Sequence, residues 1–285
     1  MDSLRIGCVK YLNARPLIRG WRGNVEFDHP FALCQRLASG QLDVALVSSF
    51  EFLRNPIYRI VDDVSISSDG SVYSVVVAHC GEFSNVEEIG LDPASQTAVN
   101  LLRCVLSELG LKPRFLSGVM GSAGCQPVVS GSLPDIGSAR LLIGDQAIHF
   151  REKHAGKFQF WDLGEQWKKL TGLPFVYALW LIRPEVTDAK SIAQRLRKLR
   201  DKNLASLDDL IEEAVAGIGL SGVALAKTDD PGPRKKVNRE FLLRYFRKHL
   251  RFSFGEKEKQ GLQRFADLCA KHGVLPARDR PFTVV

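Results

Sequence analysis

The stretch Leu4-Arg-Ile-Gly-Cys-Val-Lys-Tyr-Leu-Asn-Ala-Arg-Pro-Leu17 decides how the rest of the chain is interpreted. Its first part, Leu4 to Val9, is a short apolar run between polar residues, which predicts a buried β-strand. Arg15-Pro16 follows, and proline disfavours helix at the residue before it but suits the first turn of a new helix. The stretch therefore predicts a strand that leads into a helix, as in an α/β sheet.

Three polar side chains, Tyr11, Asn13 and Arg15, follow the end of this predicted strand. Ligands bind α/β sheets at the carboxyl ends of the strands. Because none of the three side chains titrates near pH 7, they suit a site that holds an anionic small molecule. A polar loop without a binding role is the alternative.

The composition is that of an ordinary globular protein, with 45% hydrophobic and 25% charged residues in a chain of 285. This length allows one large domain or two lobes. No run approaches the ~20 apolar residues of a membrane span. The N-terminus has no apolar secretion-signal core, because Asp2 and Arg5 flank a strand-like run. We therefore expect a cytoplasmic protein without a membrane partner.

The net charge of +7 raises the alternative of nucleic-acid binding. Much of it lies in two segments of helical or linker character, 195–202 and 234–251. No recognition motif or stacking pattern accompanies them. We interpret them as solvated helix faces whose positive field attracts an acidic metabolite, and we expect no nucleic-acid partner.

The cysteines and histidines do not form a metal-binding pattern. The six cysteines are scattered without a CxxC pair, and the six histidines are isolated, so we expect no metal site. Buried reduced thiols are the expected state of most of the cysteines, which are Cys8, Cys34, Cys80, Cys104, Cys125 and Cys269.

Strand and helix patterns alternate along the chain and predict two α/β lobes. Predicted strands are 25–27, 42–47, 73–79, 89–92, 139–143 and 176–182, and predicted helices are 31–39, 98–109, one after Gly144, 163–170 and most of the chain from Asp188. The Gly/Ser/Pro-rich segment 117–137 predicts a mobile surface loop. We assign residues 1–86 and 176–285 to the first lobe, with the C-terminal helices covering it, and 87–175 to the second.

Further polar residues follow predicted strands or begin helices. Ser49 follows the strand 42–47, and Ser74 follows the Asp69-Gly70 turn. Ser95 and Thr97 begin a helix, where N–H groups and the helix dipole favour an anion, although Ser95 is equally explained as a helix cap. Asp145 has the same two interpretations, a ligand contact or the cap of the next helix.

Several characteristic segments occur in order along nearly the whole chain: Tyr11-Leu-Asn-Ala-Arg-Pro-Leu17, Gly40-Gln-Leu-Asp-Val-Ala-Leu46, Ser68-Asp-Gly-Ser-Val-Tyr-Ser74, Leu142-Ile-Gly-Asp145, Asp162-Leu-Gly-Glu165 with Thr171-Gly-Leu-Pro-Phe-Val-Tyr-Ala178 and Trp180, and Tyr245-Phe-Arg-Lys-His-Leu-Arg-Phe252. Together they resemble one family, the chorismate dehydratases of the futalosine route to menaquinone.

The resemblance implies a fold and a reaction. The fold is that of type II periplasmic binding proteins, with two α/β lobes and a ligand in the cleft between them. The reaction is removal of water from chorismate to give 3-[(1-carboxyvinyl)oxy]benzoate, without a cofactor. By the same resemblance, Asn13 and Ser74 lie at the substrate. A non-catalytic module that binds a small carboxylated solute would use the same fold and is the alternative.

One segment departs from the family pattern. The helix entry Ala94-Ser-Gln-Thr-Ala98 lacks the arginine and the outer serines of the usual Ser-Ser-Arg-Thr-Ser. Gln96 offers only a neutral amide to a carboxylate, so we expect Arg15 to supply the missing cation. An altered substrate or a lost activity are the alternatives. The residues suggest no clear general base: His29 and His79 are candidates, and the enolpyruvyl carboxylate of the substrate is another. The sequence does not predict an oligomeric state.

Overall fold

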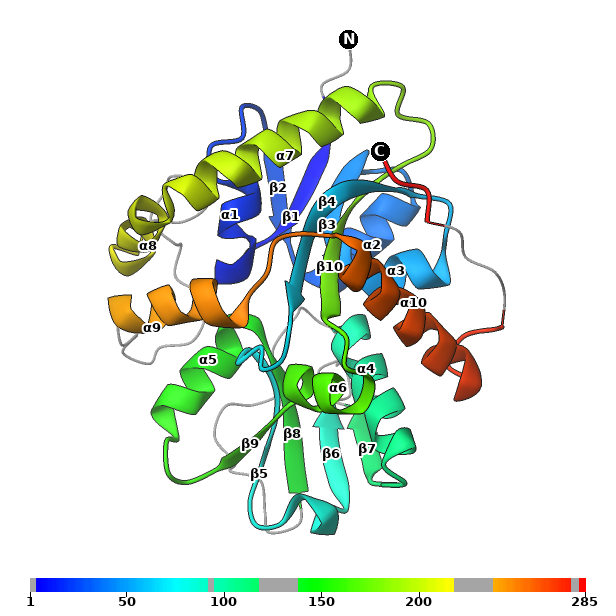
Figure 1. Cartoon of the computed structure of the whole chain (residues 1–285), viewed down its shortest axis with the longest axis vertical. Coiled ribbons are helices and arrows are strands. Elements are labelled where there is room, and N and C mark those ends of the chain that lie inside the picture. Colours follow the sequence, from blue (N-terminus) through cyan, green and yellow to red (C-terminus); the bar gives the residue numbers. More distant parts are fainter. Residues whose placement is uncertain (1–3, 92–94, 118–137, 218–237, 278–281) are drawn as a thin grey trace, which may run out of the picture.

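The computed structural model describes residues 4–91, 95–117, 138–217, 238–277 and 282–285, and places two five-stranded mixed sheets one above the other (Figure 1). The first sheet has the order β2 (Val25–Asp28), β1 (Ile6–Val9), β3 (Val44–Ser48), β10 (Phe175–Ile182) and β4 (Arg59–Ser68). The second has the order β7 (Arg114–Ser117), β6 (Glu88–Leu91), β8 (Ser138–Ile143), β5 (Val75–His79) and β9 (Gln159–Asp162). The predicted two-lobe α/β architecture is confirmed.

Helices flank both sheets. They are η1 (Leu12–Ala14), α1 (Arg15–Ile18), α2 (Pro30–Ala38), α3 (Ser49–Arg54), η2 (Phe83–Asn85), α4 (Gln96–Glu108), α5 (Gly144–Lys153), α6 (Leu163–Thr171), α7 (Ala189–Ala205), α8 (Leu207–Val215), α9 (Arg239–Arg244), the π-helical turn η3 (Tyr245–His249) and α10 (Glu256–Lys271). As predicted, C-terminal helices cover the first sheet: α7 packs on β4 and α10 on β10. α10 also contacts α4, beside the second sheet (Figure 1).

β1 and β3 run parallel and end at the sheet edge that faces the second lobe. Ile6 pairs with Val44 and Gly7 with Ala45 in the centre of this contact. A Cβ atom at Gly7 would lie 2.5 Å from the Leu42 side chain, so only glycine allows the chain to pack this closely. The parallel arrangement brings Tyr11 to Asn13 and Ser48-Ser49 to the same side of the molecule.

Two crossovers connect the lobes, one after β4 and one after α6. Asp162, at the end of β9, binds the first crossover. Its buried carboxylate accepts hydrogen bonds from Ser71 Oγ (2.7 Å) and from the backbone N–H groups of Val72 (3.1 Å) and Tyr73 (2.7 Å). It also accepts from Glu165 N at 3.1 Å and so caps α6. Residues 69–74 are thereby fixed on the end of β9.

The boundary between the two sheets lies earlier in the chain than the predicted lobe boundary at residue 86. We predicted the strand at 73–79 within the first lobe, but β5 pairs with β8 and β9 of the second sheet. A division by sheets therefore falls between β4 and β5. An apolar strand carries no mark of which sheet it joins, because both sheet interiors are equally apolar. The segment predicted as a mobile loop, 117–137, lies almost wholly outside the described residues.

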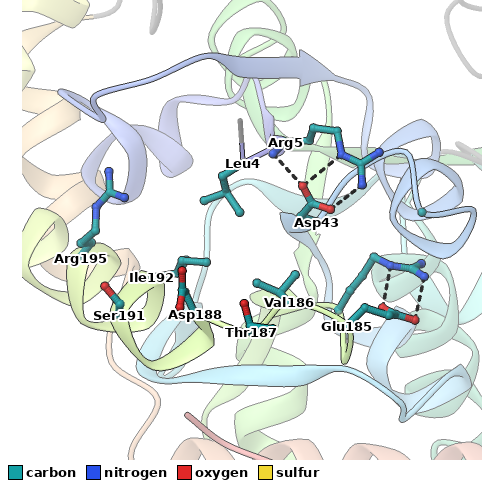
Figure 2. A pocket seen from close by; sticks show the side chains of 12 residues that line it. Leu4, Arg5, Asp43, Glu185, Val186, Thr187, Asp188, Ser191, Ile192 and Arg195 are labelled. Carbon is teal, nitrogen blue, oxygen red and sulfur yellow. Dashed lines mark hydrogen bonds and ion pairs between the residues drawn. The ribbon is translucent and has the colours of Figure 1, made fainter. Parts of the chain in front are cut away.

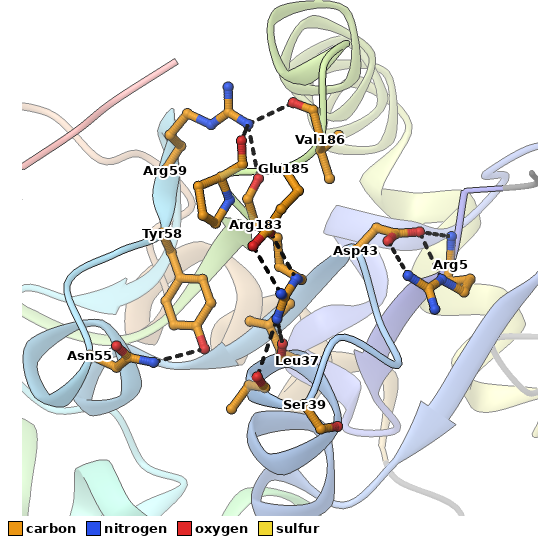
Figure 3. A network of polar contacts seen from close by, with 12 residues as sticks. Arg5, Leu37, Ser39, Asp43, Asn55, Tyr58, Arg59, Arg183, Glu185 and Val186 are labelled. Atoms are coloured by element: carbon orange, nitrogen blue, oxygen red, sulfur yellow. Dashed lines mark hydrogen bonds and ion pairs between the residues drawn. The ribbon is translucent and has the colours of Figure 1, made fainter.

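Two arginines hold backbone segments together at the far end of the first sheet (Figure 3). Arg183 Nη1 donates to the carbonyl of Leu37 at the end of α2, at 2.7 Å. Arg59 Nη2 donates to the carbonyls of Arg183 (2.8 Å) and Val186 (2.6 Å). Because these bonds satisfy backbone carbonyls at the end of α2 and beyond β10, they stabilise the edge of the lobe opposite the second sheet.

Candidate functional site

The candidate site lies where the sheet edge below β1 meets the N-terminus of α5. The backbone N–H of Leu12 donates to both carboxylate oxygens of Asp145, at 3.0 and 3.3 Å. The ring of Tyr11 covers Gly144, where an added Cβ would lie 3.1 Å from the ring carbons and where φ is +56°. A side chain at Gly144 would therefore press on the Tyr11 ring and hold the backbone in a conformation that favours glycine.

Asn13 and Ser74, the two predicted catalytic residues, meet at the hydroxyl of Tyr245. Tyr245 Oη donates to Ser74 Oγ at 2.7 Å, and both side chains are fully buried. The Asn13 side chain hydrogen-bonds the same hydroxyl, although burial keeps the pKa of Tyr245 far above its usual value. The structure thus brings together two side chains that lie 61 residues apart, through a third residue from the C-terminal part.

An unusual backbone conformation positions Ser74. The preceding residue, Tyr73, has φ of +68°, a region that non-glycine residues rarely adopt and that costs of order 1 kcal/mol or more. Asp162 accepts from Tyr73 N, while Arg151 donates to its carbonyl at 3.0 Å and lies over its ring, 3.8 Å from the centroid. Strain of this kind persists where surrounding contacts enforce it, and here it turns Ser74 toward Tyr245.

Asp145 and Arg15 bring opposite charges to the same region. Removal from water raises the pKa of Asp145 to about 6, although the Leu12 N–H, His149 and Arg15 oppose the rise. Arg15 is buried, which lowers its pKa, while Asp145 and Glu213 favour its charge. The interpretation of Asp145 as a helix cap is wrong, because Ile143 occupies that position and the carboxylate accepts from Leu12 in the other lobe.

Ser49 and Thr97 lie together at a second contact between the lobes. Thr97 Oγ1 accepts from the backbone N–H of Phe50 at 3.2 Å, hydrogen-bonds Ser48 and lies 3.4 Å from Ser49 Oγ. Ser49 Oγ donates to the carbonyl of Val176 at 2.7 Å. The hydroxyls of Ser49 and Thr97 therefore hydrogen-bond protein groups when the lobes touch. The predicted contact of these two residues with substrate stays a prediction.

Ser95 and Gln96 differ in how their polar atoms are satisfied. Ser95 Oγ accepts from Ala98 N at 3.3 Å, which confirms it as the cap of α4. Gln96 Oε1 and Asn13 Oδ1 are buried and have no hydrogen-bond partner among the described residues. Because buried polar atoms are nearly always paired, two unpaired amide oxygens in predicted ligand contacts indicate positions that a ligand completes.

The histidines proposed as bases contact neither Asn13 nor Ser74 in the described hydrogen bonds. His79 ends β5, about 16 Å along the strand from Ser74 at 3.3 Å per residue. Its buried ring contacts the Gly81 carbonyl at 3.1 Å, and burial lowers its pKa. His29 precedes α2, where its backbone N–H donates to the Asp28 carboxylate. In the part of the chain that the structure describes, no group of three or more His, Cys, Asp or Glu residues forms a metal cluster.

A surface cavity of about 700 Å³ lies at the opposite edge of the first sheet. Figure 2 shows Arg5 turned toward Asp43 there, with Arg195 on the facing helix. The arginines that line it already have partners: Arg5 pairs with Asp43, Arg183 with Glu185, and Arg195 lies over the ring of Trp21. None of the predicted site residues lines this cavity, so we place the site at the junction of the lobes.

Most of the described cysteines are buried, as the apolar sequence around them predicted. Cys8, Cys34, Cys104 and Cys269 are buried, and burial raises the pKa of Cys34 to about 12. None of the described helices is long and apolar enough to cross a membrane.

Sequence reasoning missed Tyr245 as a site residue. It occurs in the last of the family-like segments, but nothing in the local pattern separates it from the other aromatic residues of that helix. In the structure, Tyr245 is marked by the π-helical turn that begins there, because such turns are frequent at functional sites. The turn cannot be predicted from the local sequence, which is why Tyr245 was missed.

Comparisons with known proteins agree with this fold. A chorismate dehydratase of Thermus thermophilus is 28% identical over 282 residues, which cover 92% of this chain and 93% of that protein. A protein of Archaeoglobus fulgidus with a crystal structure has a TM-score of 0.65 at 14% identity, covering 95% of this chain and 98% of the other. The periplasmic aliphatic sulphonate-binding protein of Escherichia coli has a TM-score of 0.59 at 13% identity, covering 99% and 91%.

The two structures share the fold of the chain, and the second confirms the predicted resemblance to periplasmic binding proteins. A family model described as menaquinone biosynthesis matches residues 4–271, which is nearly the whole described length. The chain therefore belongs to the menaquinone biosynthesis family.

Proposed function

We propose that the protein is a chorismate dehydratase, which forms 3-[(1-carboxyvinyl)oxy]benzoate for menaquinone synthesis. The observation that carries the proposal is the meeting of Asn13 and Ser74 at Tyr245, between the two lobes. The relative from Thermus thermophilus supports the choice of substrate. A binding module would need the same fold but no reaction, and product formation separates the two.

The reaction asks little of the protein beyond orientation. Chorismate loses its C4 hydroxyl and its C3 proton as one water, and the ring becomes aromatic. The loss of one water needs no oxidant or reductant. The stability that the ring gains on becoming aromatic drives the reaction. Holding the C3–H bond and the C4 hydroxyl in the reactive arrangement is therefore the main contribution of the site. That no cofactor takes part stays a prediction.

Arg15 is the cation we propose for one of the two carboxylates of chorismate. It is buried at the junction and lies close enough to Asp145 for each to stabilise the charge of the other. Burial strengthens an ion pair with an incoming carboxylate, because water screens it less. Gln96, whose buried amide oxygen has no partner among the described residues, is the proposed contact to the second carboxylate after its amide rotates to present N–H.

We assign the C3 proton to the enolpyruvyl carboxylate of the substrate. Asp145 is the alternative acceptor, because burial raises its pKa to about 6. Both of its oxygens already accept from the Leu12 N–H, however, so a proton transfer to Asp145 would compete with this contact between the lobes.

Access to this site requires the lobes to separate. Ser74 and Tyr245 have no exposed surface, and the Leu12–Asp145 and Ser48–Thr97 contacts join the lobes on either side. The structure therefore corresponds to a closed arrangement, and substrate binds to an opened one.

The test is incubation of the purified protein with chorismate, followed by chromatographic detection of the aromatic ether. Stoichiometric formation of product with repeated turnover supports the enzyme. Calorimetric binding of chorismate without product would instead establish the binding module. A cytoplasmic location is also part of the proposal, and cell fractionation tests it.

A further inference from the structure

Tyr245 is the buried residue that contacts both predicted catalytic side chains. It begins the π-helical turn η3, whose wider hydrogen bond runs from Leu250 N to the Tyr245 carbonyl at 3.2 Å. The ring of Phe241 stacks on it at 5.7 Å between centroids and 14° between planes. His249, at the end of the same turn, contacts the Ser71 carbonyl at 2.9 Å. The turn is thereby fixed on the crossover that carries Ser74.

The hydrogen bonds around Tyr245 have one direction. Its hydroxyl has a single hydrogen, which it donates to Ser74 Oγ. It can then only accept from Asn13, and in the amide only the nitrogen donates. In the reverse direction Tyr245 would donate to Asn13 Oδ1, yet this oxygen has no partner among the described residues. The order is therefore Asn13 to Tyr245 to Ser74.

This direction determines whether Asn13 and Ser74 offer a hydrogen-bond donor or an acceptor to a ligand. Asn13 keeps a buried carbonyl oxygen that can only accept, and Ser74 keeps a hydroxyl hydrogen that can only donate. The chorismate dianion has one hydrogen-bond donor, the C4 hydroxyl, and all its other oxygens accept. The acceptor on Asn13 therefore matches the C4 hydroxyl, and the donor on Ser74 matches a carboxylate or the departing oxygen.

We propose that Tyr245 is a positioning residue that sets this direction, so that Asn13 presents an acceptor and Ser74 a donor to the substrate. The inference rests on the proposed function for the identity of the substrate. Without the Tyr245 hydroxyl, the Asn13 amide and the Ser74 hydroxyl lose their common partner and can rotate into unproductive arrangements.

The first test is a double-mutant cycle of Tyr245→Phe and Ser74→Ala in turnover of chorismate. We expect Tyr245→Phe to lower kcat about tenfold, which corresponds to about 1.4 kcal/mol, with a smaller change in KM. In the Ser74→Ala background the same substitution should lower kcat by a clearly smaller factor, because the part of its effect that passes through Ser74 is already lost and only the part that passes through Asn13 remains. Equal losses in both backgrounds would overturn the proposal. Excess enzyme in single turnovers keeps slow variants measurable.

Tyr177→Phe is the matched control. Tyr177 is also a buried tyrosine near a crossover, and its hydroxyl lies 3.1 Å from the hydroxyl of a serine, Ser68. It contacts neither Asn13 nor Ser74 in the described hydrogen bonds. We expect it to lower the melting temperature as Tyr245→Phe does, while kcat stays within twofold of the wild type. A tenfold loss of kcat in this control would mean that general loosening explains Tyr245→Phe.

Thermal unfolding of the same cycle separates this inference from the proposed function. If the wild type does not convert chorismate, the proposed function fails, but the hydrogen bond is still testable. The double variant should then lose less in melting temperature than the sum of the losses in the two single variants, Tyr245→Phe and Ser74→Ala. Additive losses would show that the two hydroxyls do not interact, and the positioning role would fail on its own.

Discussion

Replacing Asp145 by asparagine should stabilise the ligand-free protein above pH 6. The carboxylate is half-buried at the lobe junction, and its pKa rises from 3.8 to about 6 because it is removed from water. A carboxyl group with a raised pKa favours the folded state only while it is protonated. Its ionisation therefore costs stability progressively as pH rises from about 4 to 6, and the full cost remains above that range.

The magnitude follows from the shift in pKa. A rise from 3.8 to about 6 corresponds to at most about 3 kcal/mol, and solvent that reaches the half-buried side chain reduces this. The attraction of Arg15 is already included, because it is one of the effects that oppose the rise. Asparagine keeps an oxygen that accepts from Leu12 N without carrying charge. We expect Asp145→Asn to gain about 1–3 kcal/mol at pH 8 and almost nothing near pH 4.

The assay is urea unfolding followed by tryptophan fluorescence, at several pH values between 4.5 and 8, for both proteins. Asp43→Asn is the matched control, because its pairing with Arg5 lowers the pKa of that carboxyl. Its stabilising effect is present above the unfolded pKa and lost as pH falls, so this control should be less stable than the wild type at pH 8. Parallel stability curves for Asp145→Asn and the wild type would refute the reasoning.

Further substitutions test the proposed chemistry. Asp145→Asn should keep turnover within about fivefold, because the substrate carboxylate takes the proton; a loss beyond a hundredfold would assign the proton to Asp145. Asn13→Ala should keep its melting temperature within about 2 °C but lose tenfold or more in kcat, about 1.4 kcal/mol, and unchanged activity would remove Asn13 from the site. Arg15→Gln should weaken calorimetric binding of the product about tenfold or more, whereas Gln96→Arg should leave it equal or tighter; unchanged affinity in Arg15→Gln would leave the carboxylates to neutral donors. Turnover should survive exhaustive chelation and dialysis, and a requirement for added metal or nucleotide would contradict a cofactor-free reaction.

The sequence predicted β10 from its uninterrupted apolar run 176–182, whereas it did not predict β4. Its centre is Asp62-Asp63, two charged residues that normally mark a turn. In the structure Asp63 has φ of +59° and pairs with Arg200 of α7 at 2.9 Å. The partner lies 137 residues away, so the local sequence cannot show that the charge is compensated. Register shifts between β4 and β10 accommodate the irregular stretch.

For the site, the sequence predicted residues but not the pairing of their atoms. Asn13 and Thr97 are both small polar side chains after a strand or at the start of a helix. Packing of the lobes gives Thr97 three protein neighbours, while it leaves the carbonyl oxygen of Asn13 without one among the described residues. Such differences depend on contacts between segments far apart in the chain, which no local pattern contains.

The junction of the lobes carries several features that cost stability. The unpaired oxygens of Asn13 and Gln96 each cost about 1–3 kcal/mol when water is excluded, and the ionised Asp145 and the strained backbone at Tyr73 add to this. Arg59 Nε and Trp180 Nε1 in the first sheet also lack a partner among the described residues, but only the junction combines unpaired side-chain oxygens with a buried carboxylate and a strained backbone. A concentration of such costs at one place is expected where a ligand supplies the missing partners. The closed lobes are therefore stabilised by bound substrate more than the open ones, which links binding to closure.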